Sequence, residues 1–254
     1  MGLNYPDLGG RVALVTGGSR GIGAATCRLL AASGVKVAVG GRDEHAISAV
    51  VKDVDRAGGT ALPVPADVTD AKALHAATDE IARELGPITI LAAFAGGEGA
   101  PTPSTRLTAD RWRAVLESDL TAAFLTISAV LPAMIEAGGG SIVTMSSAAG
   151  RQPSEANVAY AVAKAGVTML TRHLANELGP QHVRVNCLAP SAVRNERMER
   201  YMSTEQFAQL AAAFPLGRIG EPADVAQAAA FLASDASSWI TGVTLDLSGG
   251  RVIV

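Results

Sequence analysis

Cysteine is scarce in this chain, and histidine shows no clustering. Only Cys27 and Cys187 occur among the 254 residues, each inside an apolar segment, which favours packed thiols over a disulfide. The four histidines are scattered along the chain without the spacing that metal ligands need. We therefore expect no metal site.

An excess of charge of one sign is also lacking. The 21 basic and 24 acidic residues give a net charge of −3, and neither sign forms a long run. This excludes the basic surface that would bind nucleic acid or an anionic membrane. Small molecules are the expected partners.

No segment of the sequence has the pattern of a signal peptide or of a membrane span. The residues from Met1 to Gly10 lack the basic, apolar and small-residue succession of a secretory signal. The longest uncharged apolar run, Leu120 to Ile135, contains Pro132 and three hydroxyl side chains, so we predict a buried helix there. A cytoplasmic protein is expected.

What the chain does contain is a regular alternation of short β-branched runs with longer segments of helical period. Hydrophobic residues make up 48% of the chain, enough for one large α/β domain spanning 1–254, which is simpler than two small ones. The alternation predicts βαβ units and a doubly wound, seven-stranded parallel sheet, the Rossmann fold. Strands are predicted near 11–16, 35–40, 60–65, 88–94, 140–147, 182–188 and 242–247. Helices are predicted near 21–33, 43–57, 70–85, 108–137, 154–179 and 222–234. Residues 191–217 break the alternation and are predicted to form a lid.

A glycine-rich turn follows the first predicted strand. The residues from Gly17 to Gly23 read Gly-Gly-Ser-Arg-Gly-Ile-Gly, and an apolar helix comes directly after them. Glycines allow a tight turn and let backbone N–H groups approach a diphosphate at the positive end of the helix. Because strand, turn and helix occur together, the pattern predicts a dinucleotide site. The predicted contacts within the turn are Gly17, Ser19, Arg20, Gly21, Ile22 and Gly23.

The end of the second predicted strand indicates which dinucleotide binds. Gly41 offers no carboxylate for a free ribose hydroxyl, whereas Arg42 and Arg20 would together hold a 2′-phosphate. These residues favour NADP(H). NAD(H) stays possible if both arginines are solvated and Asp43 binds the ribose, although Asp43 is better placed to cap the next helix.

Tyr160 and Lys164 lie four residues apart in a predicted helix, so their side chains share one face. Reduction of a carbonyl by hydride needs a proton donor at the oxygen, and a free tyrosine hydroxyl ionises near pH ~10. A neighbouring ammonium favours the phenolate, so that such a hydroxyl ionises at a pH closer to neutral. Ser147 follows the apolar run from Ser141 to Met145 of the fifth predicted strand, at the carboxyl edge of the sheet where ligands bind.

With the glycine turn and a serine thirteen residues before Tyr160, nearly the whole chain resembles the short-chain dehydrogenase/reductase family, and within it the 3-oxoacyl-[acyl-carrier-protein] reductases. The resemblance implies that Tyr160 is the general acid or base, that Lys164 favours its ionisation and binds the nicotinamide ribose, and that Ser147 polarises the carbonyl. Ser147 is preferred to Ser146 because it directly precedes Ala-Ala-Gly, as the family's serine does. Further cofactor contacts implied by the resemblance are Asp67, Val68, Ala95, Gly96, Pro190 and Val193. A homotetramer is also implied.

The sequence departs from the family pattern in three places. Ala93-Phe94 stand where relatives usually have two asparagines, and Ser191 follows Pro190 where they favour glycine. Asp119 stands where an asparagine usually holds a relay water. A carboxylate there would pair with Lys164 and raise the optimal pH, or it would keep the water by accepting its hydrogen. The residues leave both alternatives open.

The resemblance implies an oxidoreductase that transfers a hydride between nicotinamide and a ketone or secondary alcohol, and Arg20 and Arg42 favour NADP(H) as its cofactor. A sugar or polyol dehydrogenase is the alternative within the family. The alternative of another class is a dinucleotide-sensing or structural protein that has lost catalysis. Arg194, Arg197 and Arg200 are spaced for one helical face that would meet an acidic partner such as an acyl-carrier protein, although a solvated helix face is the more favoured interpretation. The three apolar residues at 252–254 suggest burial at a subunit interface.

Overall fold

The computed structural model describes residues 5–253 and contains a single seven-stranded sheet. The strands are β1 (Val12–Thr16), β2 (Lys36–Gly41), β3 (Thr60–Pro65), β4 (Ile88–Ala93), β5 (Gly140–Met145), β6 (Val183–Pro190) and β7 (Thr244–Leu247). All pairings are parallel, in the order β3-β2-β1-β4-β5-β6-β7. The predicted doubly wound sheet is confirmed, with strand ends within two residues of the predicted ones.

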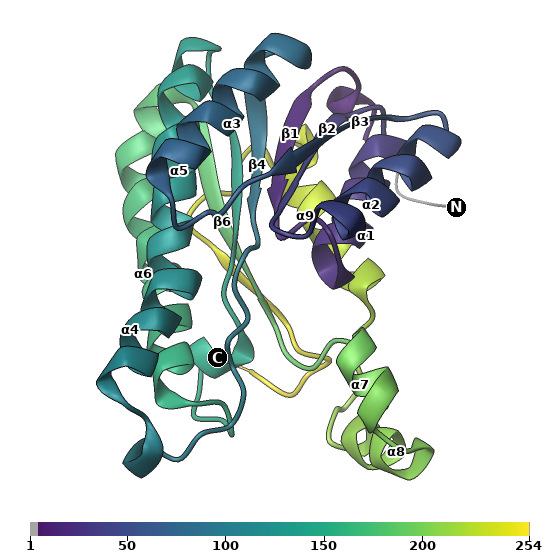
Figure 1. The fold of residues 1–254 in the computed structure, drawn as a ribbon, viewed down its shortest axis with the longest axis vertical. Coiled ribbons are helices and arrows are strands. Elements are labelled where there is room, and N and C mark those ends of the chain that lie inside the picture. The colour runs from purple at the N-terminus through teal and green to yellow at the C-terminus, as the bar shows by residue number, and fades with distance from the viewer. Residues whose placement is uncertain (1–4, 254) are drawn as a thin grey trace.

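Helices cover both faces of this sheet (Figure 1). One face carries α1 (Gly21–Ala32), α2 (Glu44–Arg56) and α9 (Pro222–Ala233). The other carries α3 (Ala71–Glu84), α4 (Ala109–Leu116), α5 (Ala122–Glu136) and α6 (Val158–Leu178). Because inner strands such as β1 and β6 are buried on both faces, they read as continuous apolar runs rather than alternating ones. Two apolar cores result, one on each side of the sheet.

The strand order reverses beside β1, and this reversal creates a crevice. The chain runs from β1 outward to β3 and then returns to place β4 on the opposite side of β1. The connections that leave the carboxyl ends of β1 and β4 therefore diverge to opposite faces. Open parallel sheets bind ligands at such a switch point.

The helices differ from the predicted ones in three places. The predicted helix at 108–137 is interrupted by a π-helical turn at Glu117–Thr121, and the helix predicted from 154 begins at Val158. The segment 191–217 contains two helices that the sequence analysis did not include, α7 (Glu196–Tyr201) and α8 (Thr204–Ala212). A capping box between Ser203 and Gln206 begins α8, and this sequence pattern was available as a signal.

Two observations bear on the predictions from scarce residue types and apolar runs. Cys27 and Cys187 are both free and buried, as predicted, and burial raises the pKa of the Cys27 thiol to about 12.

Among residues 5–253, one helical run, Ala109–Glu136, is apolar enough by length and composition to cross a bilayer, a test that core helices of water-soluble proteins also pass. In this fold the run packs against β4 and α3.

Candidate functional site

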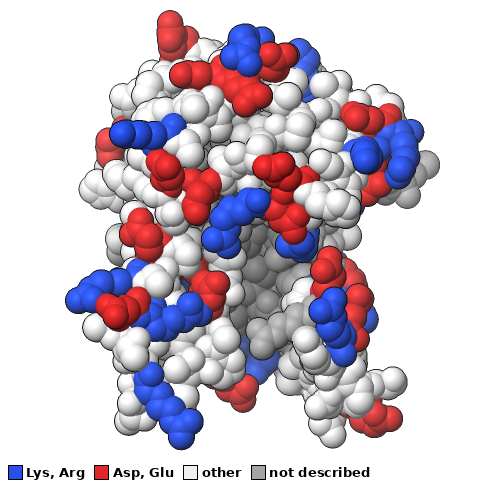
Figure 2. Space-filling view, viewed as in Figure 1, with Lys and Arg blue, Asp and Glu red and all other residues white. Residues whose placement is uncertain are grey.

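Three adjoining cavities form one cleft along the carboxyl ends of the strands. The largest, of about 650 Å³, lies over the glycine turn and shares Gly17, Arg20 and Gly96 with a second cavity of about 370 Å³ beyond β2. A third, of about 350 Å³, shares Phe94 and Met145 with the first and contains the predicted catalytic residues. Figure 2 shows this face of the molecule hollowed, with acidic and basic side chains interspersed around the hollow. The cleft therefore extends from the end of β2 to the end of β5.

The glycine turn at the centre of the cleft is suited to a diphosphate. Helix α1 begins at Gly21, and its N-cap, Arg20, makes no side-chain capping bond. The first N–H groups of the helix have no intrahelical partner and carry partial positive charge. A Cβ at Gly23 would overlap the carbonyl oxygen of Gly17, so only glycine lets the helix start pack this closely on the turn. These features fit the diphosphate of a dinucleotide.

The second cavity has the features of an adenosine site. Its lining includes the predicted contacts Gly17, Ser19, Arg20, Arg42, Asp67, Val68, Ala95 and Gly96. The carboxylate of Asp67 accepts from the backbone N–H and hydroxyl of Thr69, at 2.9 and 2.7 Å, and these bonds lower its pKa. The loop after β3 is thereby fixed in a tight turn.

Asp43 is engaged in two contacts at the edge of this cavity. Its carboxylate accepts from the Ala46 N–H at 3.0 Å and caps α2, as predicted, and it also pairs with the guanidinium of Arg20. The backbone bond and the Arg20 contact lower the pKa of Asp43. Arg42 is exposed beside it. The cavity therefore presents two guanidinium groups and three carboxylates, those of Asp43, Asp67 and Glu98, and each carboxylate already has a partner within the protein.

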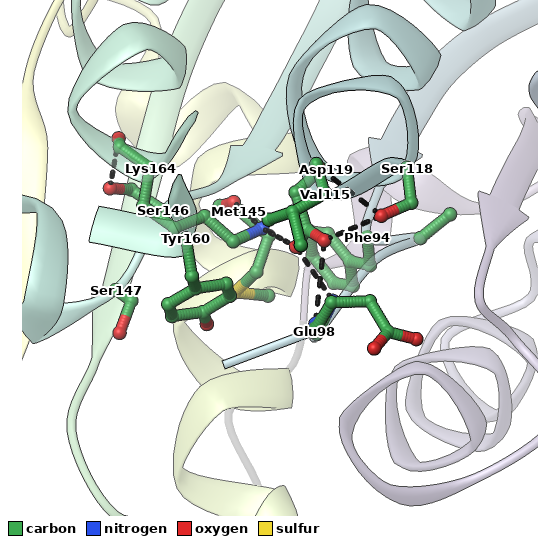
Figure 3. Close-up of polar contacts among 12 residues, drawn as sticks. Phe94, Glu98, Val115, Ser118, Asp119, Met145, Ser146, Ser147, Tyr160 and Lys164 are labelled. Atoms are coloured by element: carbon green, nitrogen blue, oxygen red, sulfur yellow. Dashed lines mark hydrogen bonds and ion pairs between the residues drawn. The ribbon is translucent and has the colours of Figure 1, made fainter. Parts of the chain in front are cut away.

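The third cavity brings together Ser147, from the loop after β5, with Tyr160 and Lys164 of α6. Tyr160 and Lys164 lie one turn apart, and the Lys164 Nζ is 5.5 Å from the centroid of the tyrosine ring. This ammonium is almost fully buried and donates to the carbonyl oxygen of Met145 at 3.0 Å. Figure 3 shows Ser147 beside the ring of Tyr160, and both residues line the cavity. The arrangement places two hydroxyl groups and one cation around a common space.

The structure distinguishes the two neighbouring serines. The hydroxyl of Ser146 is buried and donates to the Lys164 carbonyl oxygen at 2.7 Å. The hydroxyl of Ser147 accepts from the Ala149 N–H at 3.2 Å and lines the cavity, with its own proton available to a ligand. The geometry agrees with the choice of Ser147 from the sequence.

Asp119 projects from the π-helical turn into the base of the site. Its side chain is fully buried, and Oδ1 lies 3.1 Å from the Lys164 Nζ. The same oxygen accepts from the Gly97 N–H at 2.6 Å, and Oδ2 accepts from the Ser118 hydroxyl at 2.8 Å. Of the two alternatives that the sequence left open, the geometry favours pairing with Lys164.

Two residues of this site were missed by the sequence analysis. Asn157 is buried and caps α6 by accepting from the Tyr160 N–H at 2.9 Å, while its amide nitrogen donates to the carbonyl oxygens of Glu98 and Ala100. Gly99 lies under the tyrosine, where a Cβ would approach the ring to 3.0 Å. An N-cap residue three positions before the tyrosine was the available signal for Asn157. The contact of Gly99 depends on tertiary structure alone.

The loop after Ser147 is bound to the far edge of the sheet. Arg151 donates to both carboxylate oxygens of Asp246 on β7, at 3.0 and 3.1 Å, and both side chains are less than one-fifth exposed. Such a two-point contact fixes orientation as well as distance. No sequence pattern linked these residues, which are 95 positions apart.

The remaining predictions near the lid are only partly met. Pro190 and Val193 line the third cavity together with Tyr160 and Lys164, and their contact with the nicotinamide end stays a prediction. Arg194 precedes α7 and donates to Glu221 at 2.8 Å, so the prediction that it shares a helical face with Arg197 and Arg200 is wrong. Asn195 begins that helix as its N-cap, which is why the helical phase starts after Arg194. The side chain of Arg197 and all of Val254 lie outside the described residues.

A family model described as enoyl-(acyl carrier protein) reductase matches residues 17–251. The chain belongs to the short-chain dehydrogenase/reductase family. A cis-4-hydroxycyclohexanecarboxylate dehydrogenase from Sinomonas cyclohexanicum is 40% identical over 244 residues, which are 96% of this chain and 97% of that protein.

Two solved structures show the same fold over nearly the whole chain. A 7α-hydroxysteroid dehydrogenase complexed with NADH and 7-oxo glycochenodeoxycholic acid has a TM-score of 0.92 and 33% identity, covering 98% of this chain and 96% of that one. A 3-oxoacyl-[acyl-carrier protein] reductase with bound NAD from Brucella melitensis has a TM-score of 0.90 and 33% identity, covering 98% and 94%. The chain is thus an oxidoreductase of this family, whose members act on different hydroxy and keto compounds.

We expect Asn157→Ala to weaken both the fold and the site, because the substitution removes a helix cap and two bonds to the loop under Tyr160. The expected loss in unfolding free energy is about 2–3 kcal/mol. Thr108→Ala, which removes only the exposed cap of α4, is expected to cost about 1 kcal/mol. Urea denaturation measures both variants. Equal losses would contradict the anchoring of the loop by Asn157.

Proposed function

We propose that this protein is an NADP(H)-dependent oxidoreductase that interconverts a ketone and a secondary alcohol. The observation that carries the proposal is the single cleft, with Tyr160 and Lys164 at one end, two arginines at the other and the uncapped start of α1 between them. When bound, the nicotinamide supplies the hydride to the carbonyl carbon or accepts it from the alcohol carbon.

In reduction, the Tyr160 hydroxyl donates its proton to the substrate oxygen. Ser147 donates a hydrogen bond to the same oxygen and holds it near the tyrosine. The buried Lys164 ammonium stabilises the phenolate that remains and has three donors, of which Met145 and Asp119 receive two. The third is available to a ribose hydroxyl at the nicotinamide end. Oxidation of the alcohol follows the same steps in reverse.

The preference for NADP(H) rests on the charges around the adenosine cavity. Gly41 places no carboxylate at the end of β2, and Asp43 is already engaged as the cap of α2 and as the partner of Arg20. A 2′-phosphate would compete with Asp43 for Arg20 and would meet Arg42 directly. A phosphate gains charge-assisted bonds there that a ribose hydroxyl does not. NAD(H), which two similar structures contain, is the alternative.

The walls of the catalytic cavity favour a substrate with an apolar body around its carbonyl. Phe94, Met145, Ala192 and Met198 line the space beside Tyr160. A ketone or 3-oxoacyl compound fits this lining, and a relative that acts on a hydroxylated cyclohexane ring extends the class to alicyclic alcohols. A sugar or polyol would leave more hydroxyl groups without partners in the same cavity.

Substrate class is tested by following NADPH oxidation over a panel of β-ketoesters, cyclic ketones, quinones and sugars. Turnover of at least one apolar ketone is expected, with kcat lower by about 10²–10⁴ in Tyr160→Phe, because this variant keeps the ring but loses the proton donor. Cofactor affinity should change little in that variant. Tight NADPH binding with no turnover anywhere would instead indicate a dinucleotide sensor.

For the cofactor, Arg42→Ala should lower kcat/KM for NADPH by about 10- to 100-fold and leave that for NADH nearly unchanged, since only the phosphate bond is lost. Arg56→Ala removes an equally charged, exposed side chain of the neighbouring α2 and is the matched control. Steady-state kinetics with both cofactors make the comparison. A wild-type enzyme equally efficient with NADH would overturn the NADP(H) preference.

We further propose that the protein assembles as a homotetramer and that residues 191–217 act as a substrate lid. Exposed apolar side chains lie along α5 and α6, where Phe124, Val162 and Met169 are 44–60% exposed. A second copy that presents the same helices would cover them symmetrically. The small residues of α6 from Ala159 to Gly166 allow close helix packing.

Light scattering tests the assembly. The wild-type protein should have about four times the chain mass of 25.8 kDa, and Val162→Glu should lower it by placing a charge in the helix contact. Lys52→Glu, on the exposed side of α2, should leave the mass unchanged. A wild-type protein of one chain mass would refute the assembly.

A further inference from the structure

Within residues 5–253, the carboxylate of Asp119 is the only anionic group in an ion pair with Lys164. Both side chains are almost fully buried, with 0% and 3% exposure. Little water is therefore available to screen the charges, and their interaction is stronger than that of a surface ion pair. From the position of Tyr160, the lysine and the aspartate together present a dipole rather than an isolated positive charge.

We propose that Asp119 is a positioning residue that partly neutralises Lys164 and thereby raises the pH range in which Tyr160 works as a base. The proposal rests on the proposed function, because it concerns the tyrosine that exchanges the proton. An isolated ammonium stabilises a phenolate more than an ammonium paired at 3.1 Å does. Because alcohol oxidation needs the phenolate, the pH above which it proceeds is accordingly higher.

Other titratable groups around Lys164 do not replace Asp119. Tyr160 faces the ammonium from the preceding turn of α6, and the Cys187 thiol lies within electrostatic range from β6. The Glu98 carboxylate, on the loop after β4, pairs with Arg111. The π-helical turn carries Asp119 itself and the exposed Glu117. One buried carboxylate therefore dominates the field at the ammonium.

The same carboxylate also fixes the loop that passes under the tyrosine. Oδ1 accepts from the Gly97 N–H and Oδ2 approaches the Glu98 N–H at 3.4 Å. The next residue, Gly99, supports the ring of Tyr160. Asp119 thus acts on the tyrosine in two ways, through the charge of Lys164 and through the loop, and the two can be separated by substitution.

Asp119→Asn removes the charge and can keep the geometry. The amide oxygen can still accept from Gly97 and Lys164, while the amide nitrogen can donate to the Ser118 hydroxyl. That hydroxyl already lies 3.2 Å from the Val115 carbonyl oxygen, to which it can give its own proton. Only the long contact to Glu98 is lost. The variant therefore isolates the charge.

The experiment measures the pH dependence of kcat/KM for alcohol oxidation in wild type, Asp119→Asn and Glu117→Gln. In Asp119→Asn the acid limb of the profile is expected to move to lower pH by about one unit. At a pH on this limb, kcat/KM is then about tenfold higher than in wild type. Glu117→Gln removes an exposed carboxylate from the same turn and should leave the limb in place. Asp119→Ser, which also removes the charge, should move the limb in the same direction and serves if the asparagine variant does not fold.

A readout without turnover separates this proposal from the proposed function. The phenolate of Tyr160 is followed by ultraviolet absorbance, as the difference between each protein and its Tyr160→Phe counterpart. Ionisation at lower pH in Asp119→Asn than in wild type supports neutralisation by Asp119, even if no substrate is turned over. An unchanged titration and an unchanged acid limb in the folded variants would overturn it. A silent wild-type enzyme would contradict the proposed function alone.

Discussion

The burial of one ammonium group constrains the whole catalytic end of the molecule. Lys164 is 3% exposed, and a cation removed from water needs partners that replace its hydration. The carboxyl end of β5 supplies a carbonyl oxygen at Met145, and the π-helical turn supplies the carboxylate of Asp119. Because α6 carries the lysine, these contacts also fix the rotation of that helix. The tyrosine one turn earlier is therefore aimed into the cavity.

The other end of the cleft depends on backbone geometry rather than on a buried charge. The reversal of strand order beside β1 opens the crevice, and the glycine turn allows α1 to begin there with free N–H groups. Both ends of the cleft lie along the carboxyl edge of the parallel sheet. A ligand with a diphosphate at its middle, such as the cofactor proposed above, would lie between the arginine pair and the tyrosine.

The sequence predicted the features that depend on local pattern. Buried strands, the glycine turn and the Tyr160–Lys164 spacing are properties of short segments, and all appear where they were expected. The π-helical turn at Glu117–Thr121 was not predicted, because no glycine or proline marks it in the sequence. The pairs Arg20–Asp43 and Arg151–Asp246 join residues distant in sequence, and their choice of partner is decided by tertiary packing. Arg194 was misplaced for a local reason, since the N-cap at Asn195 sets the helical phase.

A crystal structure of the protein with NADPH is the most direct test that one cleft joins the arginine pair to the buried lysine and its tyrosine. The 2′-phosphate is predicted between Arg20 and Arg42, the diphosphate over the start of α1, and the nicotinamide ribose against Tyr160 and Lys164. Asp119 should remain in contact with Lys164. A cofactor whose adenosine ribose binds Asp43, or whose nicotinamide lies away from Tyr160, would contradict this arrangement.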